Sequence, residues 1–162
     1  LPNPMLDNLA DLGYKTMTPI QAQSLPHALD GKDLIAKAKT GSGKTGAYLL
    51  PCLHNIMSER KPKSGTRVLI LVPTRELAQQ VNKDCDALSN YSGMKSVVIR
   101  GGQEFQYQAS LLRRNPEVVI ATPGRTLLAQ VLTAVYFAYF LLMPWYTSIE
   151  KTKPVPERVT MK

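Results

Sequence analysis

Four short apolar runs, separated by longer segments with helical spacing, constrain the fold of this chain more than any other feature. The runs span residues 33–38, 67–72, 95–100 and 117–121, and the last three are almost continuously apolar. Such runs are typical of strands buried on both faces of a parallel sheet. The alternation of strands with helical segments predicts an α/β fold, a three-layer α/β/α sandwich around a mostly parallel sheet with right-handed crossovers.

A glycine-rich loop follows the first run, at the carboxyl end of a predicted strand, where parallel sheets bind their ligands. Glycines allow the backbone N–H groups to surround an anion, and the following helix adds its positive end. The sequence is a P-loop pattern with alanine in place of the first glycine. It predicts a polyphosphate site that uses Ala38, Lys39, Thr40, Gly41, Ser42, Gly43, Lys44 and Thr45.

Two residues of this loop carry the predicted chemistry. Lys44 is expected to reach the β- and γ-phosphates as a point charge, and the Thr45 hydroxyl is expected to ligate Mg²⁺. The competing interpretation is a chance glycine-rich turn between a strand and a helix. The agreement of loop, lysine, threonine and secondary-structure context favours the nucleotide site.

Length and charge narrow the class of protein. The 162 residues are enough for one layered core. A net charge of +8, from 20 basic and 12 acidic side chains, favours polyanionic partners. The two cysteines have no metal-type spacing, and no signal peptide is recognisable, so an intracellular, reducing compartment is expected. Because the chain starts with Leu1, we expect it to be a fragment.

The composition changes sharply near Arg125. Residues 1–125 mix charges with periodic apolar runs and are predicted to form the folded domain, whereas residues 126–149 contain no charged side chain and residues 150–162 form a polar tail. Three interpretations of the uncharged segment are open: an altered C-terminus, a membrane span, or a divergent domain end. A span is disfavoured by Gln130, Thr133 and Pro144 and by the soluble domain before it.

Five motifs together resemble one protein family. They lie in order at residues 13–21, 38–45, 73–78, 101–102 and 121–125, and they read GYKTMTPIQ, AKTGSGKT, PTRELA, GG and ATPGR. In sequence and spacing they look like the first RecA-like lobe of a DEAD-box RNA helicase. The resemblance implies a P-loop NTPase lobe that binds ATP with Mg²⁺ and takes part in unwinding or remodelling RNA.

The resemblance also implies how the base is recognised. The position of Gln21 corresponds to the glutamine that reads adenine, and an aromatic ring stacks on the base, either Tyr14 or one ahead of Leu1. A side-chain amide can pair with the N6 and N7 edge of adenine, and a flat ring offers a stacking face. The alternative is that Gln21 is an ordinary polar residue at a helix start after Thr18. Met17 departs from the family, which usually has proline there.

The resemblance further implies an RNA interface. The corresponding residues are Thr74, Arg75, Gly102, Thr122 and Arg125. Each follows a predicted strand, so all are expected at one edge of the sheet. Their chemistry suits sugar-phosphate contacts, which predicts sequence-independent and salt-sensitive binding. The alternative is that they are helix caps and ordinary surface charges. The basic loop at residues 60–65 is expected to be a solvated turn.

One element of the family pattern is absent. An Asp-Glu-Ala-Asp sequence is expected after the fifth motif, but here the region reads FLLMPWYT at residues 140–147, and no carboxylate occurs before Glu150. We therefore expect ATP and RNA binding without efficient hydrolysis. A non-enzymatic RNA-binding or dominant-negative regulator is the main alternative, and a P-loop small-molecule kinase is the weaker one.

Overall fold

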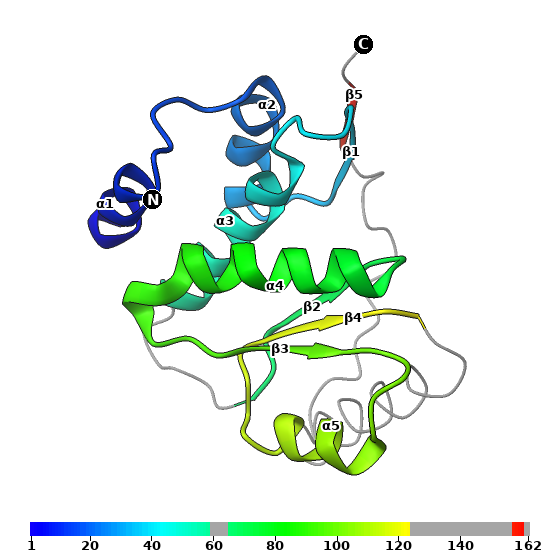
Figure 1. The fold of residues 1–162 in the computed structure, drawn as a ribbon. Helices are drawn as coiled ribbons and strands as arrows, with labels where there is room; N and C mark the ends of the chain where they lie inside the picture. Colours follow the sequence, from blue (N-terminus) through cyan, green and yellow to red (C-terminus); the bar gives the residue numbers. More distant parts are fainter. Residues whose placement is uncertain (59–64, 124–156, 161–162) are drawn as a thin grey trace, which may run out of the picture. The chain divides into compact units, whose positions relative to one another are not determined.

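The computed structural model describes residues 1–58, 65–123 and 157–160 (Figure 1). The basic loop at 60–64, Arg125, the uncharged segment at 126–149 and most of the polar tail lie outside the described residues. The chain divides into two compact units, residues 1–64 with 83–95 and 155–162, and residues 65–82 with 96–154. Helix α4 (Arg75–Ser89) contributes its first half to the second unit and its second half to the first.

The first unit is mainly helical. It contains α1 (Asn3–Asp11), α2 (Pro19–Leu29), β1 (Leu34–Lys37), α3 (Lys44–Met57), the 3₁₀ helix η1 (Asn90–Ser92) and β5 (Glu157–Thr160). Helices α2 and α3 pack against each other, and Ile20, Leu49 and Leu53 are fully buried. This packing brings the start of α2 to the loop that connects β1 to α3.

Strand β5 pairs in parallel with β1, with Leu34 opposite Glu157 and Lys37 opposite Thr160. It lies within the segment that the sequence assigned to a polar tail, where no strand was expected. Its four residues lack the continuous apolar pattern of the other strands. The pairing follows from backbone hydrogen bonds, which do not depend on side-chain hydrophobicity.

The second unit is built on a parallel three-stranded sheet in the order β2-β4-β3, with β2 (Val68–Leu71), β3 (Ser96–Ile99) and β4 (Val118–Ala121). Leu71, Ala121 and Ile99 are in register, so the three strands end at one edge. Helix α5 (Phe105–Leu112) packs against β3, and the buried cluster of Ile99, Val119 and Ala121 also contacts Leu112.

The four predicted strands agree with the structure: β1, β2, β3 and β4 each lie within a predicted run, and β5 alone among the described strands was not predicted. The expectation of burial on both faces holds for β4, whose four residues are all buried, and is wrong for β2. Leu69 and Leu71 are 38% and 51% exposed. Exposed and half-buried residues alternate along β2, so one of its faces is less covered than the other, whereas β4 lies between two neighbours and is covered on both faces.

In the part of the chain that the structure describes, no helix combines the length and apolarity needed to cross a bilayer. The uncharged segment for which a span was considered is outside that part.

Candidate functional site

The loop between β1 and α3 has a conformation that requires glycine at two positions. Gly41 and Gly43 have φ angles of +77° and +87°, which are unfavourable for any residue with a Cβ atom. Gly43 is the N-cap of α3, and the amide of Ser42 donates to the carbonyl of Lys39 at 3.4 Å. The loop therefore turns back on itself directly before a helix N-terminus, where free N–H groups and the helix dipole favour an anion.

The Lys44 ammonium lies against this loop. Its Nζ donates to the carbonyl oxygens of Ala38 at 2.6 Å and Lys39 at 2.5 Å. An ammonium group has three donors, so one N–H remains available while both contacts are made. The side chain predicted to bind phosphate is thus already positioned over the turn by backbone acceptors.

Two hydroxyl groups at the loop differ in their surroundings. The Ser42 Oγ is buried and has no hydrogen-bond partner among the described residues. Such a hydroxyl is costly unless a ligand supplies the missing partner, and a phosphate oxygen would. The Thr45 hydroxyl shares a hydrogen bond with the side chain of Tyr48, whose pKa is raised by burial although that hydrogen bond acts to lower it.

The side chains near the loop fit a magnesium ion that takes most of its ligands from water and from the phosphates of a nucleotide. Thr45 offers one hydroxyl oxygen, and within the described residues no three His, Cys, Asp or Glu side chains come together as a metal site. Mg²⁺ usually keeps several waters and binds through few protein ligands together with phosphate oxygens. Thr45 is compatible with that arrangement, provided that its hydroxyl is shared with Tyr48 or released from it.

Gln21 joins helix α2 to the loop. The Thr18 amide donates to Oε1 of Gln21 at 3.0 Å, the Gln21 amide donates to Oγ1 of Thr18 at 3.5 Å, and Nε2 of Gln21 donates to the Gly43 carbonyl at 3.0 Å. The first two bonds form a capping box, which confirms the helix-start interpretation. The side-chain amide retains one N–H and one oxygen lone pair for a further partner.

Glycines on α3 make this approach possible. A Cβ atom at Gly43 would lie 2.8 Å from both Gln21 Nε2 and Thr18 Oγ1, and one at Gly46 would lie 2.8 Å from Gln21 Nε2. The contact between Gln21 and the loop, and the close approach of Gln21 to Gly46, were not predicted from the sequence. The signal was present, since two glycines three residues apart at a helix start are typical of a close approach by another element.

Tyr14 lies in the turn after α1, and 46% of its surface is exposed. Its amide donates to the Leu9 carbonyl at 2.9 Å, which ends the helix. The structure thus brings Gln21, Gly43 and Lys44 together, and it leaves the Tyr14 ring open to solvent.

The second unit carries the residues predicted to contact RNA. Thr74 Oγ1 accepts a hydrogen bond from the Leu77 amide at 3.2 Å and therefore caps α4, as the simpler interpretation requires. The Arg75 guanidinium lies on the glycine pair after β3, because a Cβ atom at Gly102 would be 2.7 Å from Nη1 and one at Gly101 would be 3.3 Å from Nη2. The segments after β2 and β3 are thus in direct contact.

The end of β4 completes this edge. The Thr122 amide donates to the Ile99 carbonyl at 3.1 Å, and the Val72 amide donates to the Ala121 carbonyl at 2.9 Å. These bonds extend the sheet by one residue beyond the strands. Thr122 is only 9% exposed, so its side chain offers less surface to a ligand than Thr74 does. The shared strand register confirms that Thr74, Arg75, Gly102 and Thr122 follow strand ends at one edge.

A buried glutamine that the sequence analysis did not identify supports the same edge. Gln108 on α5 is 2% exposed, accepts from the Arg100 amide at 2.9 Å and donates to the Gln103 carbonyl at 3.2 Å. With its amide oxygen toward the guanidinium, Gln79 accepts from Arg100 at 3.2 Å. The turn that contains Gly102 is therefore held from two helices. No local sequence signal distinguishes Gln108 from a surface glutamine.

The comparisons with known proteins all match this chain to helicases. The family model described as "DEAD/DEAH box helicase" matches residues 18–138. The chain is 46% identical over 125 residues to "ATP-dependent RNA helicase DeaD" of Klebsiella pneumoniae, which covers 76% of this chain and 19% of that protein. It is 45% identical over 122 residues to "ATP-dependent RNA helicase DDX54" of Mus musculus, which covers 75% of this chain and 14% of that protein.

A solved structure is also similar. The RNA helicase Prp28 of Chaetomium thermophilum bound to ADP matches with a TM-score of 0.70 and 34% identity, over 99% of this chain and 43% of that one. The chain thus spans less than a quarter of the two curated relatives and less than half of the solved one.

Proposed function

The chain belongs to the DEAD/DEAH box helicase family, as a part of its first RecA-like lobe, and from this premise we propose that it binds ATP at the β1–α3 loop and RNA at the β2-β4-β3 edge. The observation that carries the proposal is the loop itself, where the Lys44 ammonium, two glycines with positive φ and the buried Ser42 hydroxyl surround a helix N-terminus. In the intact family members, the two activities are coupled in ATP-dependent RNA unwinding or remodelling.

At the nucleotide site, the residues have distinct roles. The backbone of residues 38–43 binds the phosphates, Lys44 places its charge on the β- and γ-phosphates, and Ser42 donates to a phosphate oxygen. Thr45 would hold Mg²⁺, which would neutralise negative charge on the phosphates when it is bound. Among the described residues, Lys44 and Thr45 are accordingly proposed to act at the reacting phosphate.

Adenine recognition rests on Gln21 and Tyr14. The free N–H and lone pair of the Gln21 amide suit the N7 acceptor and N6 donor of adenine, and the exposed Tyr14 ring suits stacking. Because Gln21 also donates to Gly43, base binding and loop conformation are linked through one side chain.

A competition experiment tests the adenine assignment. A fluorescent ADP analogue bound to the 162-residue chain is displaced with ATP or GTP, and we expect ATP to compete at least about tenfold better, because guanine presents an acceptor where adenine presents the N6 donor. Equal competition by the two nucleotides would exclude base reading by Gln21. The Lys44→Ala variant serves as the control for displacement from another site.

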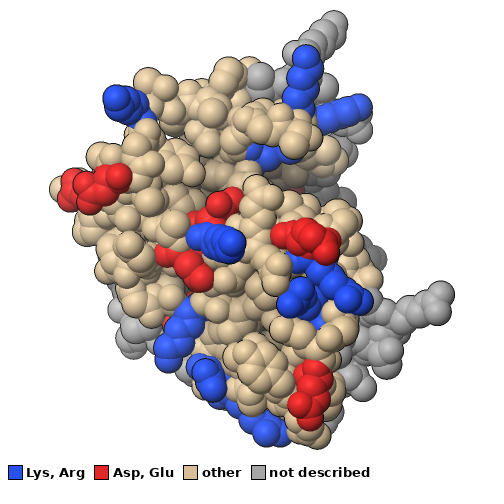
Figure 2. All heavy atoms as spheres, viewed as in Figure 1, with Lys and Arg blue, Asp and Glu red and all other residues tan. Residues whose placement is uncertain are grey.

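RNA binding is proposed to use Thr74, Arg75, Gly102, Thr122 and Arg125, through sugar and phosphate contacts. The support is the position of Arg75, whose guanidinium lies on Gly101 and Gly102 at a sheet edge that also ends β4. Figure 2 shows that basic side chains lie among acidic ones on the face that it draws. Because this face carries no purely basic area, we assign phosphate binding to the local arrangement of Arg75 at the strand ends and not to a broad basic surface.

Replacing Arg75 with alanine is expected to weaken binding of single-stranded RNA by a similar factor for different sequences, and to reduce the slope of log affinity against log salt by about 1. Fluorescence anisotropy with labelled oligouridine and a mixed-sequence oligomer measures both. Arg114→Ala is the matched control, because it removes the same charge from the segment before β4, away from the strand ends. Equal losses of RNA affinity in both variants would show that binding depends on the net charge of the chain and not on the position of Arg75.

A further inference from the structure

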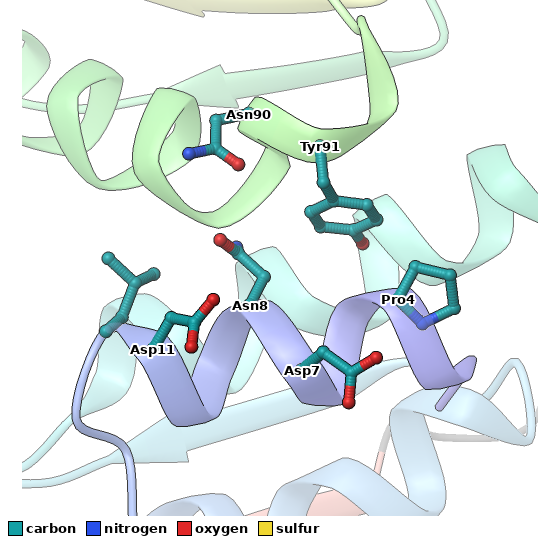
Figure 3. Close-up of a pocket in the computed structure, with 7 residues that line it drawn as sticks. Pro4, Asp7, Asn8, Asp11, Asn90 and Tyr91 are labelled. Carbon is teal, nitrogen blue, oxygen red and sulfur yellow. The ribbon is translucent and has the colours of Figure 1, made fainter.

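The hollow between α1 and η1 in the first unit is a packing feature. Its lining carboxylates, Asp7 and Asp11, do not converge on one point (Figure 3). Asn8 joins its two walls, because Nδ2 donates to the carbonyls of Ala87 at 3.0 Å and Leu88 at 3.2 Å. These contacts hold α1 on the end of α4.

Two aromatic rings of the second unit lie in the first turn of α5, beside the proposed RNA edge. Phe105 is 50% exposed and Tyr107 is 52% exposed. Phe105 follows Gly102 by three residues, so their Cα atoms are at most about 11 Å apart. Arg75, whose guanidinium lies on Gly101 and Gly102, is therefore close to the start of this helix. The RNA contacts proposed above use neither ring.

Helix α5 is fixed to the turn that precedes it. Gln108 is buried, accepts from the Arg100 amide at 2.9 Å and donates to the Gln103 carbonyl at 3.2 Å. One turn further on, Leu112 packs against the buried cluster that includes Ile99. Figure 1 shows α5 running back alongside β3, so the helix starts at the carboxyl end of that strand. The first turn of α5 is thus held beside the strand ends.

Helical periodicity separates the two rings. Phe105 precedes Gln108 by three residues and Leu112 by seven, so it shares with them the face of α5 that packs on the sheet. Tyr107 lies about 100° around the helix from Gln108 and about 140° from Leu112, on a different face. Phe105 is therefore on the sheet side of α5 and still half exposed, which indicates that its ring extends past the ends of the strands.

We propose that the Phe105 ring stacks on a base of single-stranded RNA, next to the nucleotide whose phosphate contacts Arg75; this inference rests on the RNA interface proposed above. Proteins that bind single strands combine basic contacts to the backbone with aromatic rings on which bases stack. Every base has a flat face, so stacking is compatible with sequence-independent binding. The exposed residue directly before the ring is Glu104, and its carboxylate repels a phosphate, which favours a base at this position.

The test measures fluorescence anisotropy of a labelled single-stranded oligouridine with the 162-residue chain. Phe105→Ala is expected to weaken binding about five- to twentyfold, because one base loses its stacking partner. Tyr107→Ala is the matched control, since it removes a ring of nearly equal exposure two residues away, and it is expected to change the affinity by less than about twofold. Phe105→Tyr is expected to keep the affinity, whereas Phe105→Leu is not, because leucine keeps apolar volume but has no ring face.

Two further readouts separate stacking from a loss of charge or of structure. An oligomer with abasic central nucleotides is expected to bind the unchanged chain more weakly than oligouridine does, and Phe105→Ala is expected to bind both oligomers equally. The slope of log affinity against log salt is expected to stay the same in Phe105→Ala, because no phosphate contact is lost, and to fall by about 1 in Arg75→Ala.

Equal RNA affinity of Phe105→Ala and the unchanged chain, or equal losses in Phe105→Ala and Tyr107→Ala, would overturn the stacking contact. A loss in Arg75→Ala without a loss in Phe105→Ala would do so while leaving the RNA interface in place. Absence of RNA binding by the unchanged chain would overturn the RNA interface and, with it, the stacking contact.

Discussion

Replacing Lys44 with alanine is expected to weaken ATP binding by about 10- to 100-fold, while the loop remains folded. The Lys44 ammonium donates to the backbone carbonyls of Ala38 and Lys39 and so lies against the turn. A charge-assisted hydrogen bond to phosphate contributes about 1.5–3 kcal/mol, which corresponds to that range of affinity. Loss of the two contacts to backbone carbonyls in the free protein offsets part of the effect.

Isothermal titration with ATP and with adenosine measures this prediction. Affinity for ATP is expected to fall, whereas affinity for adenosine is expected to stay nearly constant, since the proposed base contacts come from Gln21 and Tyr14 and not from Lys44. Lys32→Ala is the matched control: it removes one positive charge from the same unit, and its ion pair with Asp30 at 3.8 Å is largely exposed and contributes little. A similar loss for both nucleotide and nucleoside would mean that the variant disrupts the loop and does not report on phosphate binding.

The 162-residue chain is expected to bind ATP but to hydrolyse it at least about 10²–10⁴-fold more slowly than an assembly that includes a positioned general base. The proposed phosphate contacts of Lys44 and the loop backbone, and the proposed Mg²⁺ contact of Thr45, bind the ground state. None of residues 126–149 carries a charge, and we therefore expect that this segment offers no carboxylate to anchor Mg²⁺ and orient the attacking water. Binding without transition-state groups lowers a dissociation constant but leaves the barrier high.

Phosphate release measured with and without single-stranded RNA checks this expectation, with Lys44→Ala as the control that subtracts contaminating ATPase. Turnover that RNA stimulates clearly above the control would contradict it and would require Glu150 or another carboxylate to anchor Mg²⁺ and orient the water. Retained RNA binding without turnover would instead favour a non-enzymatic, regulatory role for this chain. A small-molecule kinase would transfer phosphate to an acceptor other than water, and RNA would not affect its binding of ATP.

The contacts of Gln21 show which features of the site the sequence pattern predicts and which it does not. Thr18, Pro19 and Gln21 predict a capped helix start, and the structure confirms the capping box. The hydrogen bond from Gln21 to Gly43 joins residues 22 positions apart, and it depends on the packing of α2 on α3. Capping is a local property of the chain and is predictable, whereas this contact requires two helices to meet at glycines.

The sequence by itself determined the local elements of this protein: β-branched runs became strands, and glycines with positive φ formed the loop before α3. Tertiary structure alone decided that β4, which follows β2 and β3 along the chain, lies between them, that β5 pairs with β1, and that Arg75 lies on Gly102. The physical reason is the range of the interactions. Backbone conformation and capping depend on neighbours in sequence, but strand order and side-chain packing depend on which distant surfaces are buried together. Many pairings of similar apolar strands satisfy the same sequence pattern, so the pattern does not select one of them.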